Sequence, residues 1–151
     1  MSTSSSVPSW LGIGGVLPFA LLAAGLWLLP IAHSALMVKW LVGYGAVILT
    51  FVGALHWGVA MAHPEVPERD RGRLMIWSVL PALVAWVALG LPPLWGLLLL
   101  GAMFLIQYEA DRRLDKRFPL TLWFLRLRGR LTAAVVICIG LAVLGLWRNG
   151  A

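Results

Sequence analysis

Five long apolar stretches, joined by short linkers, are the feature that most limits how this chain can fold. A helix needs about 20 mainly apolar residues to cross the hydrocarbon core of a bilayer. The stretches that reach or approach this length are 10–29, 36–61, 74–91, 94–111 and 131–147. Because only helices and closed barrels satisfy their backbone groups in lipid, the sequence predicts an all-α polytopic membrane protein. We expect a bundle of five transmembrane helices that forms a single membrane domain over residues 1–151.

Composition excludes a soluble domain. Of the 151 residues, 61% are hydrophobic and only 12% are charged, whereas an average soluble domain has about 25% charged residues. The net charge of +6 would also suit a nucleic-acid-binding protein. However, the basic residues flank the apolar stretches, where Lys and Arg set topology and contact anionic headgroups. We therefore expect the lipid bilayer and its anionic headgroups as partners, and no nucleic acid. A partner subunit or a homo-oligomer is left open.

The distribution of basic residues predicts the orientation. The loop 69–73 holds three arginines and the loop 112–130 holds seven basic residues, whereas only Lys39 and Arg148 lie at the other side. Cytoplasmic loops carry the excess of Lys and Arg, so we expect a cytoplasmic N-terminus and a periplasmic C-terminus. The first eight residues contain no Lys or Arg. This argues against a signal peptide and a mitochondrial presequence, so we expect a retained first span in a bacterial inner membrane.

The basic segment 119–130 mixes arginines with bulky apolar residues. At helical spacing, one face collects Leu120, Trp123, Phe124 and Leu127. We expect a short interfacial helix that lies on the cytoplasmic surface and leads into the fifth span. A plain topology-setting loop would explain the charges equally well, but it would not explain the adjacent Trp and Phe.

His56 is the candidate functional residue that stands out, because it lies within an apolar stretch. An ionisable group at membrane depth is costly and marks a functional site by default. At helical spacing, the small residues Gly45, Gly53 and Ala60 share its face, so a neighbouring helix can approach closely. We therefore predict that His56 points into the bundle. Either it is a packing residue that hydrogen-bonds across a helix interface, or it binds a ligand or handles protons.

Other polar residues gather in the same, cytoplasmic half of the predicted bundle. Asp111 and Arg128 fall at similar depths, and an ion pair between them would close the cytoplasmic mouth; the alternative is a solvated aspartate among basic neighbours. We predict a polar cavity with a basic rim of Arg126 and Arg130. The candidate ligand-binding residues are His56, Trp57, Ser78, Tyr108, Asp111 and Arg128, and Gln107 and Thr132 lie at similar depth.

A proline inside the third span predicts a helix kink at Pro81. Proline removes one helical hydrogen bond, which leaves the carbonyl of Trp77 without its partner. Freed backbone groups in a membrane must be satisfied, so Ser78 or His56 is a candidate partner; a purely structural kink is the alternative.

The motifs of metal, cofactor and nucleotide sites are missing from the sequence. The single cysteine, Cys138, excludes an internal disulfide and a cysteine-based metal cluster. There is no phosphate-binding Gly-rich loop and no His-Glu-x-x-His zinc motif. A haem with two axial histidines would need a second histidine inside the membrane, but His33 and His63 lie at the boundaries. We therefore assign no catalytic residue, metal or cofactor.

Several short motifs, in order, resemble the small multi-pass membrane family catalogued as domain of unknown function 3429. The matching stretches are 15–19, 51–58, 78–81 with Trp86, 108–111, and 123–132. One departure is Phe124, where the family pattern favours tyrosine and its hydroxyl. The resemblance implies a five-helix membrane protein and no known activity. It also picks out His56, Ser78, Tyr108, Asp111 and Arg128.

Three classes of function remain open. The leading hypothesis is a non-enzymatic membrane protein whose cytoplasm-facing polar cavity binds a lipid headgroup, a quinone head or a partner subunit. The second is a small, proton-coupled transporter that uses the histidine and aspartate within the bundle. The third is a membrane enzyme acting on lipid or quinone, with His56 as base and Asp111 as its partner. The sequence identifies neither ligand nor substrate.

Overall fold

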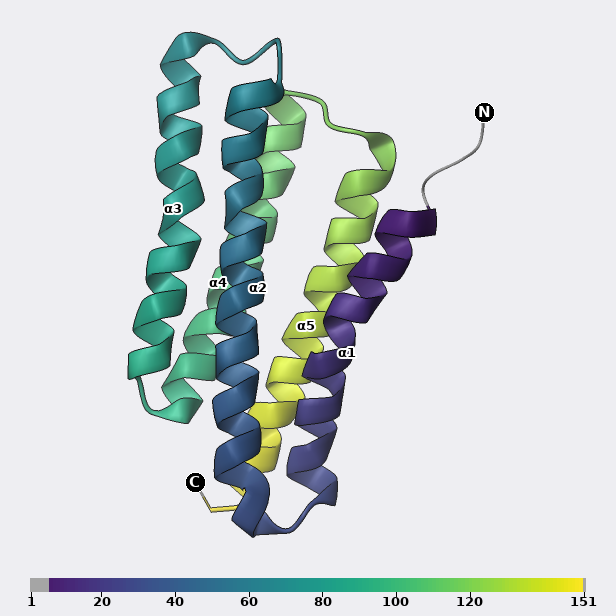
Figure 1. Ribbon diagram of the computed structural model, residues 1–151, viewed down its shortest axis with the longest axis vertical. Helices are drawn as coiled ribbons and strands as arrows, with labels where there is room; N and C mark the ends of the chain where they lie inside the picture. Colours follow the sequence, from purple (N-terminus) through teal and green to yellow (C-terminus); the bar gives the residue numbers. More distant parts are fainter. Residues whose placement is uncertain (1–5, 151) are drawn as a thin grey trace.

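The computed structural model describes residues 6–150 and contains five long helices (Figure 1). They are α1 (Ser6–Leu28), α2 (Ser34–Ala62), α3 (Glu68–Gly90), α4 (Pro93–Arg117) and α5 (Leu122–Arg148). A short 3₁₀ turn, η1 (Ile31–His33), joins α1 to α2. All five helices are long and apolar enough to cross a membrane. Residues 1–5, on which part of the argument about a leader peptide depends, lie outside the described residues.

The helix ends follow from the proline and glycine positions. Pro30 follows α1, and Pro67 immediately precedes α3. The link between α3 and α4 is only Leu91 and Pro92, because Pro93 begins α4 at a position where its missing N–H costs nothing. In this tight hairpin a Cβ at Gly96 would lie 2.7 Å from the carbonyl oxygen of Ala88. The two helices therefore need a glycine at this position.

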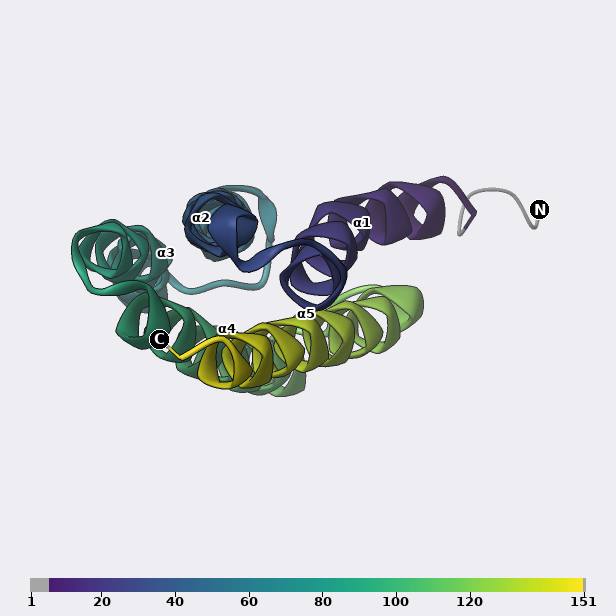
Figure 2. The same cartoon turned by 90° about the horizontal axis from the view of Figure 1, so that it is seen from below.

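The bundle has two layers. Seen along its axis, α1, α2 and α3 lie in a row, and α4 and α5 lie below them (Figure 2). The first helix packs against α5 and α2, whereas α3 packs mainly against α2. One apolar core runs through the bundle and includes Phe19, Leu41, Leu49, Leu97 and Leu100.

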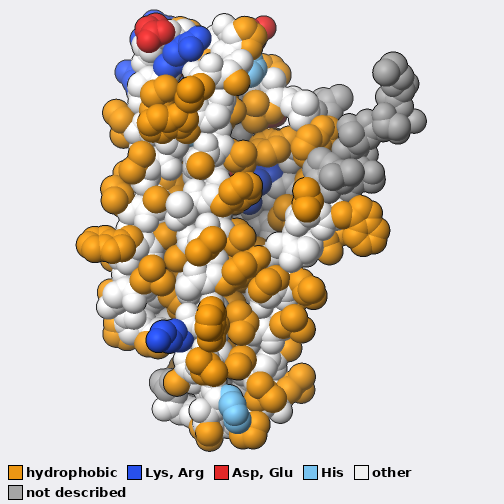
Figure 3. All heavy atoms as spheres, in the orientation of Figure 1, with side chains coloured by type: hydrophobic (Ala, Val, Ile, Leu, Met, Phe, Trp, Pro, Cys, Tyr) orange, Lys and Arg blue, Asp and Glu red, His pale blue; other side chains and the backbone are white. Residues whose placement is uncertain are grey.

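The outer surface is apolar, as expected for a protein surrounded by lipid. Large hydrophobic side chains such as Phe51, Ile76, Trp86 and Trp147 are exposed, and Figure 3 shows hydrophobic atoms over most of the visible face. Charged side chains gather at one end, where α1 begins and where the links α2–α3 and α4–α5 lie (Figures 1 and 3). The links α1–α2 and α3–α4 lie at the opposite end.

The prediction of a separate interfacial helix over 119–130 is wrong within the described residues. From Leu122 onward this segment forms the first turns of α5, which continues unbroken to Arg148. No proline follows Pro119 in this region, and the glycine at 129 lies inside the helix. A Cβ at Gly129 would lie 2.8 Å from the Tyr108 hydroxyl oxygen, so this glycine permits close packing of α5 on α4. The aromatic residues Trp123 and Phe124 therefore belong to the fifth helix.

Candidate functional site

A buried hydrogen-bond network connects four of the five helices, and Gln107 on α4 is its centre. The indole Nε1 of Trp77 on α3 donates to Gln107 Oε1 at 3.2 Å. Because an indole N–H is a donor only, this contact fixes the orientation of the amide. The amide nitrogen then donates to His56 Nδ1 at 3.1 Å and to Asp111 Oδ1 at 3.2 Å. The three hydrogen bonds of the Gln107 amide therefore each have a defined direction.

The amide orientation also defines the state of His56, whose side chain is almost fully buried. Its Nδ1 accepts the hydrogen bond from Gln107, so the ring carries its proton on Nε2. The same Nδ1 lies 3.6 Å from Asp111 Oδ1. His56 lies six residues before the end of α2 at Ala62, on the face that it shares with buried Gly45 and Gly53. The prediction that this histidine points into the bundle agrees with its position.

The second half of the network is an ion pair between α4 and α5. Arg128 Nε lies 2.8 Å from Asp111 Oδ2, and this is the pair expected from the similar depths of the two residues. Asp111 is 2% exposed and Arg128 is 7% exposed, so neither charge is solvated. Arg128 Nη1 donates to Thr132 Oγ1 at 3.1 Å. Arg128 Nη2 is buried and has no hydrogen-bond partner among the described residues.

Helical spacing explains why these side chains meet. Gln107 and Asp111 are four residues apart on α4, and Arg128 and Thr132 are four residues apart on α5. Residues at this spacing share one face of a helix and lie one turn apart. The paired faces of α4 and α5 therefore place an amide, a carboxylate, a guanidinium and a hydroxyl on one continuous strip.

Three of the predicted cavity residues lie outside this network. Trp57 is exposed, and its indole nitrogen contacts Met61 Sδ at 2.9 Å on the same helix. Ser78 is buried, but its hydroxyl donates to the carbonyl of Met75 at 2.6 Å, so it does not serve the carbonyl of Trp77. Tyr108 is half-buried against the backbone of α5. The expected basic-rim residues, Arg126 and Arg130, are exposed near the start of α5.

The sequence argument assigned no site role to Gln107, Trp77 and Thr132. All three are neutral side chains, so the cost of burying charge did not draw attention to them. Gln107 lies four residues before Asp111, and Thr132 lies four residues after Arg128. This spacing to a buried charge was the available signal. Trp77 carried no such signal, because tryptophans are common at membrane interfaces.

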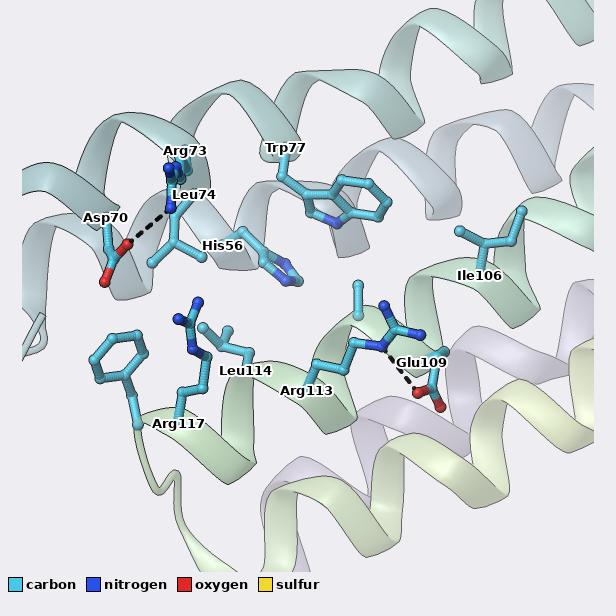
Figure 4. A pocket seen from close by; sticks show the side chains of 12 residues that line it. His56, Asp70, Arg73, Leu74, Trp77, Ile106, Glu109, Arg113, Leu114 and Arg117 are labelled. Carbon is cyan, nitrogen blue, oxygen red and sulfur yellow. Dashed lines mark hydrogen bonds and ion pairs between the residues drawn. The ribbon is translucent and has the colours of Figure 1, made fainter.

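A cavity of about 460 Å³ lies between α3 and α4 at the charged end of the bundle (Figure 4). His56 and Trp77 form its inner wall, and Arg73, Arg113 and Arg117 surround it. The cavity also contains two acids that pair with arginines. Arg73 lies 3.6 Å from Asp70, and Arg113 Nε donates to Glu109 at 3.1 Å. His56 thus connects the buried network to a cavity whose walls are largely apolar and carry three arginines and two acids.

A second cavity, of about 520 Å³, lies between α1, α2 and α5 on the other side of the network. Its lining side chains are apolar apart from Trp123 and Arg128. Figure 3 shows a hollow at this place, with a basic side chain at its bottom. The network therefore lies between the two cavities: His56 and Trp77 line the α3–α4 cavity, and Arg128 lines the apolar cavity. Among residues 6–150, no group of three or more His, Cys, Asp or Glu side chains could hold a metal ion.

The fold and the comparisons with known proteins define the class. With five apolar helices long enough to span a bilayer, the chain is an integral multi-pass membrane protein. Residues 4–144 match the family described as protein of unknown function (DUF3429), and the chain belongs to this family. It is also similar to transmembrane protein 69 of Xenopus tropicalis, with 30% identity over 139 residues. The alignment covers 86% of this chain, which spans about half (51%) of that relative's length. No solved structure matches the chain.

Proposed function

We propose that this chain is a non-enzymatic membrane protein that binds an anionic lipid headgroup in the cavity between α3 and α4. One observation carries the proposal. Three arginines, Arg73, Arg113 and Arg117, surround a cavity at the end of the bundle where the basic residues gather. Guanidinium groups suit phosphate, because their fork of N–H donors matches its oxygens. A phospholipid in the surrounding leaflet would place its phosphate at this depth.

The charge balance of the cavity supports an anion. Three arginines and two acids, Asp70 and Glu109, line it, so its formal charge is 3 − 2 = +1 with His56 neutral. One phosphodiester would neutralise this charge. Arg117 is the arginine of the three for which no ion pair within the cavity is described, so we assign it the first contact with the phosphate. His56 Nε2–H, whose ring lines the inner wall, is an additional donor.

The proposed orientation places this cavity on the cytoplasmic side of a bacterial inner membrane. The excess of basic residues at this end supports the assignment, since cytoplasmic ends of membrane helices carry more Lys and Arg. The inner leaflet would then supply the anionic lipid. A partner subunit with an acidic segment is the competing occupant, and the experiment below distinguishes the two.

The described side chains give less support to a transporter. The polar network lies in one half of the bundle, whereas the core toward the other end is formed by apolar residues such as Leu41, Leu97 and Ala142. A path for protons or polar solutes would need polar groups there.

Native mass spectrometry of the full chain in mild detergent, with phosphatidylglycerol added, tests the proposal. The test variant is Arg113→Gln/Arg117→Gln. The control is Arg112→Gln/Lys116→Gln, which removes the same charge from exposed positions of the same helix that do not line the cavity. We expect wild type and control to retain phosphatidylglycerol and the test variant to lose most of it. Equal loss in both variants would mean non-specific surface attraction. Retention of a protein subunit in place of lipid would favour the competing occupant.

A further inference from the structure

The α3–α4 cavity contains a buried acceptor whose hydrogen-bonding capacity is not used. Asp70, in the first turn of α3, lines this cavity, and its side chain is only 9% exposed. Among residues 6–150, no hydrogen bond to its carboxylate is described, and its ionic partner is Arg73 at 3.6 Å, whose own side chain is 79% exposed. Buried polar groups are nearly always hydrogen-bonded, because an unmet one is costly. A bound molecule could supply the missing donor.

The Asp70 oxygens can be reached from the cavity. Among the described residues, Arg128 Nη2 is the buried side-chain atom that is both closed to solvent and without a partner. The Asp70 oxygens also lack a hydrogen bond, but they are not closed off in this way. In Figure 4 the carboxylate points from α3 into the space between α3 and α4. A donor on a molecule in the cavity can therefore contact it.

Helix capping does not explain why Asp70 is buried. The third residue of a helix often accepts a hydrogen bond from the backbone N–H of the N-cap residue. Asp70 holds that position in α3, but the N-cap residue is Pro67, which has no N–H. The helix dipole favours an acid in the first turn, and the exposed Glu68 already supplies one. The carboxylate of Asp70 is therefore available for another partner.

The polarity of the cavity changes along the bundle in the same order as along a phospholipid. Asp70 in the first turn of α3 and Arg117 in the last turn of α4 both lie at the charged end, on facing walls (Figure 4). Ile106 lies deeper, and with Trp77 it forms an apolar part of the wall. At 1.5 Å per residue, Ile106 and Arg117 are about 16 Å apart along α4. A phosphate at Arg117 thus leaves the acyl chains near Ile106 and the rest of the headgroup near Asp70.

The charge of the cavity determines which donor suits Asp70. The formal charge of +1 already includes the carboxylate of Asp70, and one phosphodiester neutralises it. An ammonium group on the same headgroup would restore a net positive charge at a largely buried position, which is costly. A hydroxyl group donates a hydrogen bond without adding charge. A hydroxylated headgroup therefore satisfies both the arginines and the aspartate.

We propose that Asp70 makes this cavity selective for anionic phospholipids whose headgroup carries a hydroxyl group beyond the phosphate, with that hydroxyl donating to the Asp70 carboxylate. The inference rests on the proposed function, since it assumes that the phosphate of the same lipid lies at Arg117. It adds a requirement that attraction between charges does not impose. Two lipids of equal charge should bind differently if only one of them carries the hydroxyl.

Native mass spectrometry of the full chain, with an equal mixture of dioleoylphosphatidylglycerol and dioleoylphosphatidylethanol, tests this requirement. The two lipids have the same acyl chains and the same negative charge, but only the first has headgroup hydroxyls. We expect wild type to retain phosphatidylglycerol with a preference of about tenfold, as a hydrogen bond to a charged, buried acceptor would give. Equal retention of the two lipids by wild type would overturn the inference.

Variants of Asp70 test the acceptor. Asp70→Ala should bring the preference close to one, whereas Asp70→Asn, which removes the same charge but keeps an acceptor oxygen, should keep part of it. The control is Glu68→Gln, which removes an exposed acid from the same turn outside the cavity and should keep the full preference. Because the preference compares lipids of equal charge, the change in general attraction cancels. A full preference in Asp70→Ala would overturn the role of Asp70.

The variant Arg113→Gln/Arg117→Gln separates this inference from the proposed function. If that variant loses both lipids while wild type retains them equally, the anion site is supported and the hydroxyl selectivity is overturned. If that variant keeps both lipids, the proposed function itself is overturned. A third mixture pairs phosphatidylglycerol with dioleoylphosphatidylethanolamine, which carries an ammonium donor. We expect wild type to prefer phosphatidylglycerol, and a preference for the ethanolamine lipid would overturn the assignment of a hydroxyl donor.

Discussion

At the residue scale, the ion pair of Asp111 and Arg128 is costly, because folding removes both charges from water. Both charges are buried, and the surrounding hydrogen bonds from Gln107 and to Thr132 hold them in one geometry. Breaking such a pair by removing one partner costs much more than replacing both partners with apolar residues, since the remaining charge has no compensation. The pair should therefore behave as a unit in mutational tests.

We expect Asp111→Ala to destabilise the fold by about 3–5 kcal/mol, because it leaves the guanidinium of Arg128 buried without its carboxylate. The double variant Asp111→Leu/Arg128→Met should regain most of that loss. The free energy of unfolding is measured by titrating the detergent-solubilised chain with sodium dodecyl sulfate and following helical circular dichroism. A double variant no more stable than Asp111→Ala would show that the hydrogen bonds of the network, and not charge burial, dominate.

The candidate site was predicted in part because charge and depth can be read from a sequence. The approximate depths of His56, Asp111 and Arg128 came from their distances to the span ends, and the structure brings all three together. Helical phase near an interface is harder to read. Trp57 was included as the neighbour of His56, yet it faces outward. Gln107 was noted for its depth alone, because a neutral amide reveals its role only when its three partners are known.

At the element scale, α2 and α3 pack most closely where α2 carries a glycine, Gly53. A Cβ at Gly53 would lie 2.7 Å from Pro81 Cγ and 3.0 Å from the carbonyl oxygen of Ser78. Neither a proline ring nor a backbone carbonyl can move away as a flexible side chain can. Small residues at such interfaces allow helices in membranes to approach closely. Pro81 is therefore a packing surface for α2 as well as an interruption of the hydrogen bonds of α3.

We expect Gly53→Ala to destabilise the bundle by about 1–3 kcal/mol, the usual cost of forcing extra volume into a packed interface. Gly43→Ala is the matched control on the same helix, because a Cβ there would meet no atom within 4 Å. It should change stability by less than about 1 kcal/mol, and in the stabilising direction, since alanine favours helix. The same detergent titration measures both. Equal destabilisation by the two variants would contradict a close contact at Gly53.

The five apolar helices followed from the lengths of the apolar stretches, but the helix ends at the charged side did not. Membrane thickness sets how long the apolar part must be, and it does not limit how far a helix continues beyond it. Thus α4 continues to Arg117 and α5 already begins at Leu122. The arginines there keep their helical conformation because i,i+3 and i,i+4 pairs, such as those of Glu109 with Arg112 and Arg113, support it.

At the scale of the whole molecule, the charges divide the bundle into two unlike ends. The end that contains the links α2–α3 and α4–α5 carries most of the basic residues, whereas Lys39 and Arg148 belong to the other end (Figure 1). The proposed anion site and the buried network lie toward the basic end. The orientation in the membrane thus decides which compartment can reach them.

We expect the α1–α2 link to face the periplasm and the α2–α3 link to face the cytoplasm, following the excess of basic residues. A Cys138→Ala background removes the single native cysteine. Ala32→Cys and Glu65→Cys then place one exposed thiol in each link. On intact spheroplasts, a membrane-impermeant maleimide should label Ala32→Cys at once and Glu65→Cys only after permeabilisation. The reverse pattern would contradict the proposed orientation and move the basic cavity to the periplasmic leaflet.

The pairing of α1 with α5 has a consequence for the order of assembly. The first helix packs against the last one, and Asp111 receives its guanidinium from the last one as well. During synthesis, the chain therefore passes through a four-helix stage in which an aspartate lies in the bundle without its countercharge and α1 lacks its main neighbour. Both defects are resolved by the same event, the arrival of α5. The packing of α5 thus completes two separate interactions of the bundle at the same time.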